Sequence, residues 1–311
     1  MRPAASLIIF TTLSGLGLGL AALIGLGYLE AKSSQWIIIH AAMCLGLIGA
    51  GIISSTVHLG HPERAWRALS QWRSSWLSRE GVMAGLTTIV LAGYFLDQLY
   101  SGVARPWLGI IVSILSLITI YTTAMIYASL KTIARWHHVL TPVVFVLLAL
   151  AGGCLLAAAL QALAGTASTA PFDVPLTQWG IGLIALASLV KIIWWVNAGK
   201  NGSGSTPESA TGLGGLGGLG EVRMIMPPHT EENWLQHEMG FVVARKHAAR
   251  LAIIAFILAA ILPLLVLGLY PQSAALLILA AAIHLAGVMM ERWLFFAEAK
   301  HTVTLYYGDR H

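Results

Sequence analysis

Apolar and polar residues alternate along this chain in long blocks. Eight blocks of about 20 apolar residues have the length that an α-helix needs to cross a hydrocarbon layer. These blocks span approximately residues 6–28, 36–57, 82–100, 107–130, 139–164, 178–198, 250–269 and 273–296. Lipid offers the backbone no hydrogen-bond partners, so each block is expected to be helical. The pattern predicts an all-α polytopic membrane protein with eight transmembrane helices.

Composition agrees with this prediction. Hydrophobic residues make up 57% of the chain and charged residues 10%, whereas soluble proteins average about 25% charged residues. The first block is too long for the apolar core of a signal peptide and no small-residue cleavage site follows it, so we expect it to be the first membrane helix. Cys44 and Cys154 lie inside apolar blocks without a C-x-x-C motif. They are expected to be small buried side chains, and the chain is not expected to bind an iron–sulfur cluster or a covalent haem by itself.

Lysine and arginine are distributed unevenly between the two ends of the predicted helices. Fifteen of them belong to the N-terminus, the second, fourth and sixth loops and the C-terminus, and only Lys32 and Arg105 belong to the opposite face. The positive-inside rule therefore predicts that both termini are cytoplasmic. The net charge of +5 is then explained by topology and anionic lipid, and no nucleic-acid partner is expected.

The order of the blocks predicts three parts. Residues 1–198 hold six transmembrane helices and a cytoplasmic interfacial hairpin at 58–80, and residues 250–311 hold two helices and a cytoplasmic tail. Between them, 199–249 is a glycine-rich cytoplasmic loop that is too short for a core of its own. We expect this loop to dock a partner, and a flexible linker is the alternative. Its G-x-x-G-x-x-G spacing is not a dinucleotide fingerprint, since no strand precedes it.

The hairpin is the most polar stretch between two membrane blocks. Pro62 and Glu63 suit the first turn of a short helix. Apolar residues then recur at spacings of three or four from Trp66 to Trp76. Such a helix is expected to lie in the headgroup plane with its tryptophans toward the lipid. Generic anchoring at the interface remains the alternative explanation for its tryptophans and arginines.

The two ends of the hairpin suggest proton chemistry. His58 ends the second block, and Ser78 is expected to N-cap the third helix, which places Glu80 in its first turn. A histidine and a carboxylate at one depth can exchange protons with a quinone or quinol, and Arg64 and Arg79 could hold Glu80 ionised or orient a carbonyl oxygen. A structural pairing of helix ends is the alternative to this quinone site.

Other polar residues in or beside the apolar blocks give less support for a functional role than His58 and Glu80. Trp136 and His137 cluster at the cytoplasmic face and, with Trp76, are candidates to line a pocket. His40 and His284 are candidate axial haem ligands by residue type, but their predicted depths differ, so neither haem nor metal is expected. Lys191 is expected to snorkel toward the inner surface, and the adjacent Glu291 and Arg292 are expected to form an ion pair.

Three segments carry a family resemblance. H-L-G-x-P-x-R-A-W-x-x-L followed by S-S-W-L-S-R-E-G, the stretch 126–142 and M-E-R-W-L-F-F at 290–296 resemble the membrane-anchor subunits (DmsC-like) of dimethyl sulfoxide reductase-type molybdoenzymes. The resemblance implies quinone chemistry (ubiquinone or menaquinone) at the positions of His58 and Glu80, in an anchor without haem. It also implies an iron–sulfur subunit on the cytoplasmic face, a subunit with the molybdenum cofactor, and a place in the bacterial inner membrane.

Two departures from the short anchors of this family narrow the expectation. The long sixth loop resembles the longer anchors that accompany cytoplasmic sulfite dehydrogenases, and the docking hairpin is predicted to be cytoplasmic. Both favour electron flow from sulfite to the quinone pool, with substrate chemistry on a partner polypeptide. The alternatives are a quinol-oxidising anchor of a dimethyl sulfoxide, S-oxide or N-oxide reductase and, from other classes, a secondary transporter or a purely structural anchor.

Overall fold

The computed structural model describes residues 3–57, 59, 61–166, 174–200, 204–213, 222, 225–226 and 243–307. Every regular element among them is helical, and eight helices are long and apolar enough to cross a membrane, so the predicted fold class is confirmed. The elements are α1 (Ala5–Gly25), α2 (Ser34–Val57), η1 (Pro62–Gln71), α3 (Trp76–Ser101), α4 (Pro106–Ala128), α5 (Leu140–Ala164), α6 (Leu176–Asn197), α7 (Pro207–Thr211), α9 (Val243–Phe256), η4 (Ile257–Ile261), α10 (Leu262–Leu269), α11 (Ala274–Ala297) and η5 (Thr302–Tyr307).

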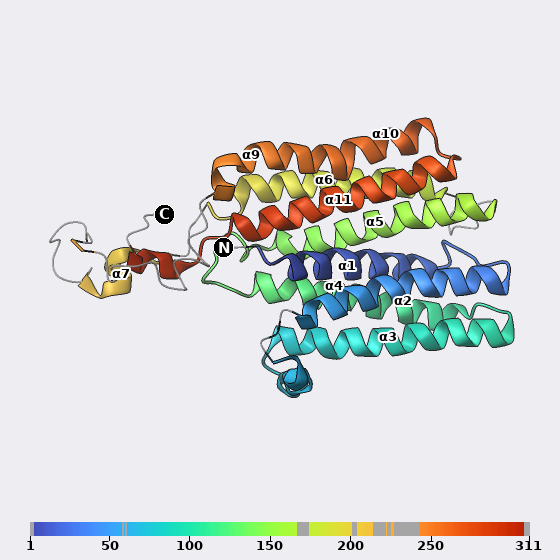
Figure 1. Ribbon diagram of the computed structural model, residues 1–311, viewed down its shortest axis with the longest axis horizontal. Helices are drawn as coiled ribbons and strands as arrows, with labels where there is room; N and C mark the ends of the chain where they lie inside the picture. The colour runs from blue at the N-terminus through green and yellow to red at the C-terminus, as the bar shows by residue number, and fades with distance from the viewer. Residues whose placement is uncertain are drawn as a thin grey trace.

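Helix α1 forms the centre of the bundle (Figure 1). It packs against α2, α4, α5 and α11, and 72% of its most apolar stretch is buried, compared with 28% in α2 and α3. Small residues allow this close packing. A Cβ on Gly19 would collide with the backbone of Ala149 in α5, and one on Gly153 would collide with the backbone of Gly19. Two of the closest backbone approaches in the bundle therefore depend on glycine.

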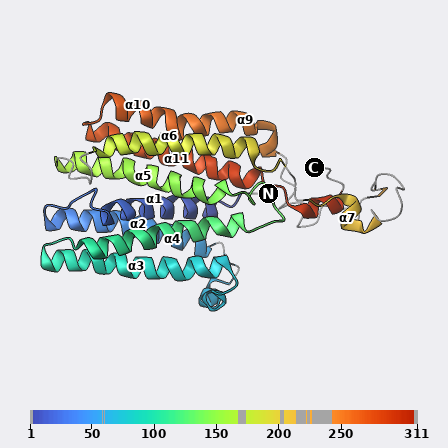
Figure 2. The same cartoon turned by 180° about the vertical axis from the view of Figure 1, so that it is seen from behind.

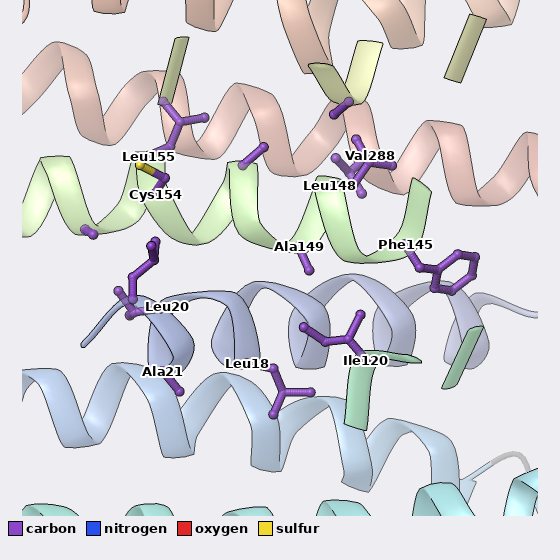
Figure 3. Close-up of a cluster of buried hydrophobic side chains, with 14 of the residues drawn as sticks. Leu18, Leu20, Ala21, Ile120, Phe145, Leu148, Ala149, Cys154, Leu155 and Val288 are labelled. Atoms are coloured by element: carbon purple, nitrogen blue, oxygen red, sulfur yellow. The ribbon is translucent and has the colours of Figure 1, made fainter. Parts of the chain in front are cut away.

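The other helices form two groups on either side of α1. Helices α2, α3 and α4 form the first group with α1. In the second group α6 and α11 pack against α5, and α9 and α10 pack against α11. Figure 3 shows the apolar core where α5 lies between α1 and α11, with Leu18 and Leu20 on one side and Val288 on the other. Cys154 is buried there and, as expected for a small core residue, is a free thiol.

Helix α3 starts earlier than the sequence predicted. Its N-cap is Ser75, whose Oγ accepts a hydrogen bond from the Ser78 backbone N–H at 3.4 Å. The predicted cap at Ser78 is therefore wrong, and Glu80 lies in the second turn of the helix rather than the first. Arg79, one turn into the helix, donates back to the Trp72 and Arg73 carbonyls and so fixes the hairpin against a helix that starts at Trp76.

The seventh transmembrane helix also differs from the prediction. It begins at Val243 instead of residue 250, and it contains a π-helical turn, Ile257–Ile261, between α9 and α10. Pro263 follows this turn, and a proline inside a helix has no N–H to donate to the carbonyl four residues earlier. The uniform hydrophobicity of this block gave no sign of the change in winding.

One end of the bundle carries η1, the segment 129–139 between α4 and α5, and the start of α9; we name it the hairpin end (Figure 1). The hairpin residues 62–71 form a 3₁₀-helix without a buried side chain. Pro62 lies in its first turn, as the sequence predicted. At the same end, α7 and η5 contact each other beyond the helices. The glycine-rich stretch 214–221 of the sixth loop lies outside the described residues.

Candidate functional site

Glu80 lies near the hairpin end, buried between α3 and α4. Its exposed fraction is 6%, and the side chain of Thr123 in α4 lies beside its carboxyl group. One carboxylate oxygen, Oε1, is buried without a hydrogen-bond partner. Among the described residues no cation forms an ion pair with Glu80. A buried carboxyl group with a vacant hydrogen-bonding position is costly to maintain and is therefore a functional candidate.

The other predicted members of this site are not gathered around Glu80. His58 lies outside the described residues, so its expected depth stays a prediction. Arg64 is exposed, and its nearest carboxylate is Glu63 at 3.8 Å. Arg79 donates to the Trp72 and Arg73 carbonyls at 3.0 and 2.7 Å and covers the Trp76 ring at 4.2 Å. Arg79 therefore fastens the hairpin to α3, and neither arginine pairs with Glu80.

A hollow lies between α4 and α5 at the same end of the bundle. The ribbons of these two helices are seen from behind in Figure 2. The volume of the hollow is about 610 Å³, within the range of about 300–1,000 Å³ that small-molecule sites occupy. Ten residues line this α4–α5 hollow: Tyr121, Met125, Ala128, His137, His138, Val139, Pro142, Val143, Val146 and Leu147. Trp76 meets the lining residue Tyr121 edge-on, with ring centroids 6.1 Å apart. A mostly apolar wall with two imidazoles suits an apolar ligand with a polar head.

The two histidines of the hollow have different hydrogen-bonding capacities. Nδ1 of His137 is 2.6 Å from the Ala128 carbonyl oxygen and must donate to it, which leaves Nε2 as an acceptor in the neutral ring. Nδ1 of His138 accepts the Leu140 backbone N–H at 3.1 Å, so its proton is on Nε2. Burial lowers the pKa of His138, which favours the neutral ring. In their neutral forms the two rings would provide one donor, at His138, and one acceptor, at His137.

Helix α4 separates Glu80 from the hollow. Thr123 faces Glu80, whereas Tyr121 and Met125 face the hollow. Two residues along an α-helix correspond to a rotation of about 200°. The carboxylate and the hollow therefore lie on opposite sides of α4, an arrangement that the sequence did not predict.

Trp136 does not line the hollow. It is 4% exposed, its Nε1 donates to the Phe295 carbonyl at 2.8 Å, and its ring stacks on that of Phe295. Tyr127 packs edge-on against Trp136 and lies within electrostatic range of both Glu80 and Arg292. Trp136 thus anchors the segment 129–139, and Tyr127 lies between Glu80 and the charges of the second group.

Sequence reasoning missed a cluster of charges inside the second group, which we name the inner charge cluster: Lys191, Glu291 and Arg292. Lys191 is 4% exposed and pairs with Glu291, so the expectation that it snorkels is wrong. Arg292 lies 3.2 Å from the other Glu291 oxygen, as the expected ion pair. Lys191 and Glu291 each precede the end of their helix by six residues. Their equal depth was the signal that could have identified the cluster.

Comparison with known proteins gives consistent matches. A family model described as DMSO reductase anchor subunit (DmsC) matches residues 1–201. The chain is 31% identical to a sulfite dehydrogenase subunit of Allochromatium vinosum, over 99% of both chains. It is 30% identical to the anaerobic dimethyl sulfoxide reductase chain YnfH of Escherichia coli, over 60% of this chain and 66% of that one. A second anaerobic dimethyl sulfoxide reductase chain of the same organism is 32% identical over 45% of this chain and 50% of its own length.

Proposed function

The chain belongs to the DMSO reductase anchor subunit (DmsC) family, as its sequence motifs indicated, and on this basis we propose that it is the quinone-reactive membrane anchor of a three-subunit molybdoenzyme. It would hold an iron–sulfur subunit and a molybdenum-containing catalytic subunit at the hairpin end. The excess of lysine and arginine at that end supports a cytoplasmic orientation in the bacterial inner membrane.

The match over the full length supports sulfite as the source of electrons. The sulfite dehydrogenase subunit aligns over 99% of this chain, including the sixth loop and the last two helices, whereas the two Escherichia coli reductase chains align over 60% and 45%. Oxidation of sulfite to sulfate with water releases two electrons and two protons. We propose that the electrons pass through the partner subunits to the quinone pool.

The residues of the hairpin end fit a quinone in two respects. When bound there, a quinone takes up two electrons and two protons and leaves as the quinol. Glu80 is suited to pass protons inward because it is buried, has an unpartnered oxygen and has no counter-ion to displace among the described residues. We assign proton transfer to Glu80 together with His58. The α4–α5 hollow, with a donor at His138 and an acceptor at His137, is the second candidate binding site for the quinone head group.

The experiment is turnover of the complex in membranes with sulfite. Electrons are passed either to a soluble quinone analogue or to an artificial acceptor that reacts with the partner subunits. We expect Glu80→Gln to lower quinone-linked turnover about 100-fold or more, the lower range for loss of a general acid or base, and to leave artificial-acceptor turnover unchanged. The matched control is Asp97→Asn on the same helix, because Asp97 pairs with Arg105 at the opposite end of the bundle.

The outcomes separate the alternatives. Unchanged quinone turnover in Glu80→Gln, with a large loss in His137→Asn and His138→Asn, would assign the quinone site to the α4–α5 hollow. If the native complex shows no quinone-linked turnover, the chain is a purely structural anchor. Substrate flux through the isolated chain would instead favour a transporter. The family match over residues 1–201 also supports the reverse direction. Oxidation of quinol with reduction of an S-oxide or N-oxide, but no sulfite oxidation, would establish that alternative.

A further inference from the structure

The inner charge cluster is incompletely satisfied by protein atoms. Lys191 pairs with one oxygen of Glu291 and Nη1 of Arg292 lies 3.2 Å from the other, but Nε of Arg292 is buried without a hydrogen-bond partner. The Arg292 guanidinium lies 3.4 Å from the centre of the Phe145 ring, and the Lys191 ammonium 3.7 Å from that of Trp194. Aromatic faces stabilise the cations but supply no acceptors along the N–H directions. Buried polar atoms of this kind usually bind water.

His284 extends the polar surface toward the middle of the membrane. It is 2% exposed and is the eleventh residue of the 24-residue helix α11. Glu291 follows it by seven residues, which places both on one face of the helix about 10 Å apart. Side chains on a helix lean toward its N-terminus, so the Glu291 carboxylate points toward the turns that carry His284. Both side chains line one and the same small hollow.

The π-helical turn explains how His284 is held. Pro263 has no N–H to donate to the Ala259 carbonyl, and His284 Nδ1 donates to it at 2.6 Å instead. Gly287 allows this approach, because a Cβ there would collide with the Ala259 backbone. The other ring nitrogen, Nε2, is buried beside the Leu148 carbonyl without a hydrogen bond of good geometry. Of the two ring nitrogens, Nε2 is therefore the one left for water.

Two small hollows meet at His284. One is lined by His284, Glu291 and Lys191, and the other by His284, Arg292 and the α1 residues Thr11 and Thr12. Each has a volume of about 20 Å³, and a cavity of about 10–15 Å³ is enough for one water molecule. The lining of each hollow includes His284 and at least one charged side chain of the inner charge cluster, so a water molecule there would have polar groups within its wall.

We propose that these hollows hold water molecules that connect Glu291 and Arg292 to His284, and that they form a hydrated site through which protons from the hairpin end reach the His284 ring. The Arg135–Glu298 ion pair at 2.7 Å lies at that end, and the Arg135 guanidinium lies 5.3 Å from the Trp194 ring, on which Lys191 also packs. The charged groups near the ring are Glu291, Arg292 and Lys191. The residues of α1, α5 and η4 that lie around the His284 ring are uncharged. The site is separate from Glu80 and does not depend on the quinone role.

The test is water-edited solid-state NMR of the full chain in liposomes with labelled histidine, in which magnetisation is transferred from water to nearby side chains. His284→Gln assigns the His284 signal. We expect transfer to His284 to build up several-fold faster than transfer to His40, and the His284 ring N–H to exchange in D₂O before that of His40. His40 is the internal control because it is also 2% exposed and lines none of the described hollows.

A filling substitution tests the position of the water. Ser188 lines the hollow shared by Glu291 and His284, so Ser188→Leu should slow transfer to His284 several-fold without changing any charge. Ala185→Leu, on an exposed position of the same helix, should not. Transfer to His284 as slow as to His40 in the native chain would overturn the proposal, as would rapid transfer that Ser188→Leu leaves unchanged. The native comparison stands even if the filled variant does not fold.

Discussion

Two buried carboxylates near the hairpin end have opposite surroundings. Glu80 in the first helix group is 6% exposed and has no ion-pair partner among the described residues, whereas Glu291 in the second group is 4% exposed and lies between Lys191 and Arg292. Glu80 can exchange a proton without breaking an ion pair. Loss of the charge on Glu291 would strand two buried cations. The difference assigns proton exchange to the first carboxylate and a fixed charge to the second.

The largest expected effect is a loss of stability on substitution of Glu291. Glu291→Leu leaves Lys191 and Arg292 without a counter-ion, and removal of one partner from a buried ion pair costs about 3–5 kcal/mol. We expect a large loss of folded protein and a lower unfolding temperature in detergent. Glu80→Gln removes the other carboxylate without stranding a charge and should remain folded. Equal stability of the two variants would refute the contrast.

A double-mutant cycle sharpens the comparison. Lys191→Met, Glu291→Gln and their combination should give a coupling free energy of about 1–3 kcal/mol, because the two side chains are in direct contact. The same cycle with Arg79→Gln and Glu80→Gln should give a value near zero, since Arg79 bonds to backbone carbonyls instead. Unfolding in mixed micelles measures both cycles. A large coupling between Arg79 and Glu80 would mean that the two do pair in the membrane.

The smallest expected effect concerns the α4–α5 hollow. Burial lowers the pKa of His138, so the unfolded chain binds this proton more readily than the folded chain. Its contribution to stability is therefore complete above the ordinary histidine pKa and declines as the pH falls through about 6.5. His138→Asn keeps an acceptor for the Leu140 N–H and should lose less stability than the native chain between pH 7 and 5. Parallel unfolding temperatures for the two proteins across this range would contradict the expectation.

The position of polar residues relative to the helix ends was largely predictable. Apolar blocks located all eight helices, and the proline at 62 predicted the short hairpin helix. The start of α3 was not predicted, because Ser75 and Ser78 are both good caps and only the Arg79 contacts favour the first. The π-helical turn was missed for a similar reason: Pro263 was visible, but its consequence depends on His284 in another helix.

Hydrophobicity and charge, which are local properties of each segment, decided the number of helices and the expected orientation, and short sequence motifs indicated the family of this protein. The tertiary structure alone decided which faces of these helices meet. A transmembrane helix is apolar on nearly all sides, so its sequence has no amphipathic period to show which face is inside. For this reason only the packed structure placed Glu80 and the hollow on opposite sides of α4. The same reason explains why Lys191 was found beside Glu291 only after the two helices were seen together.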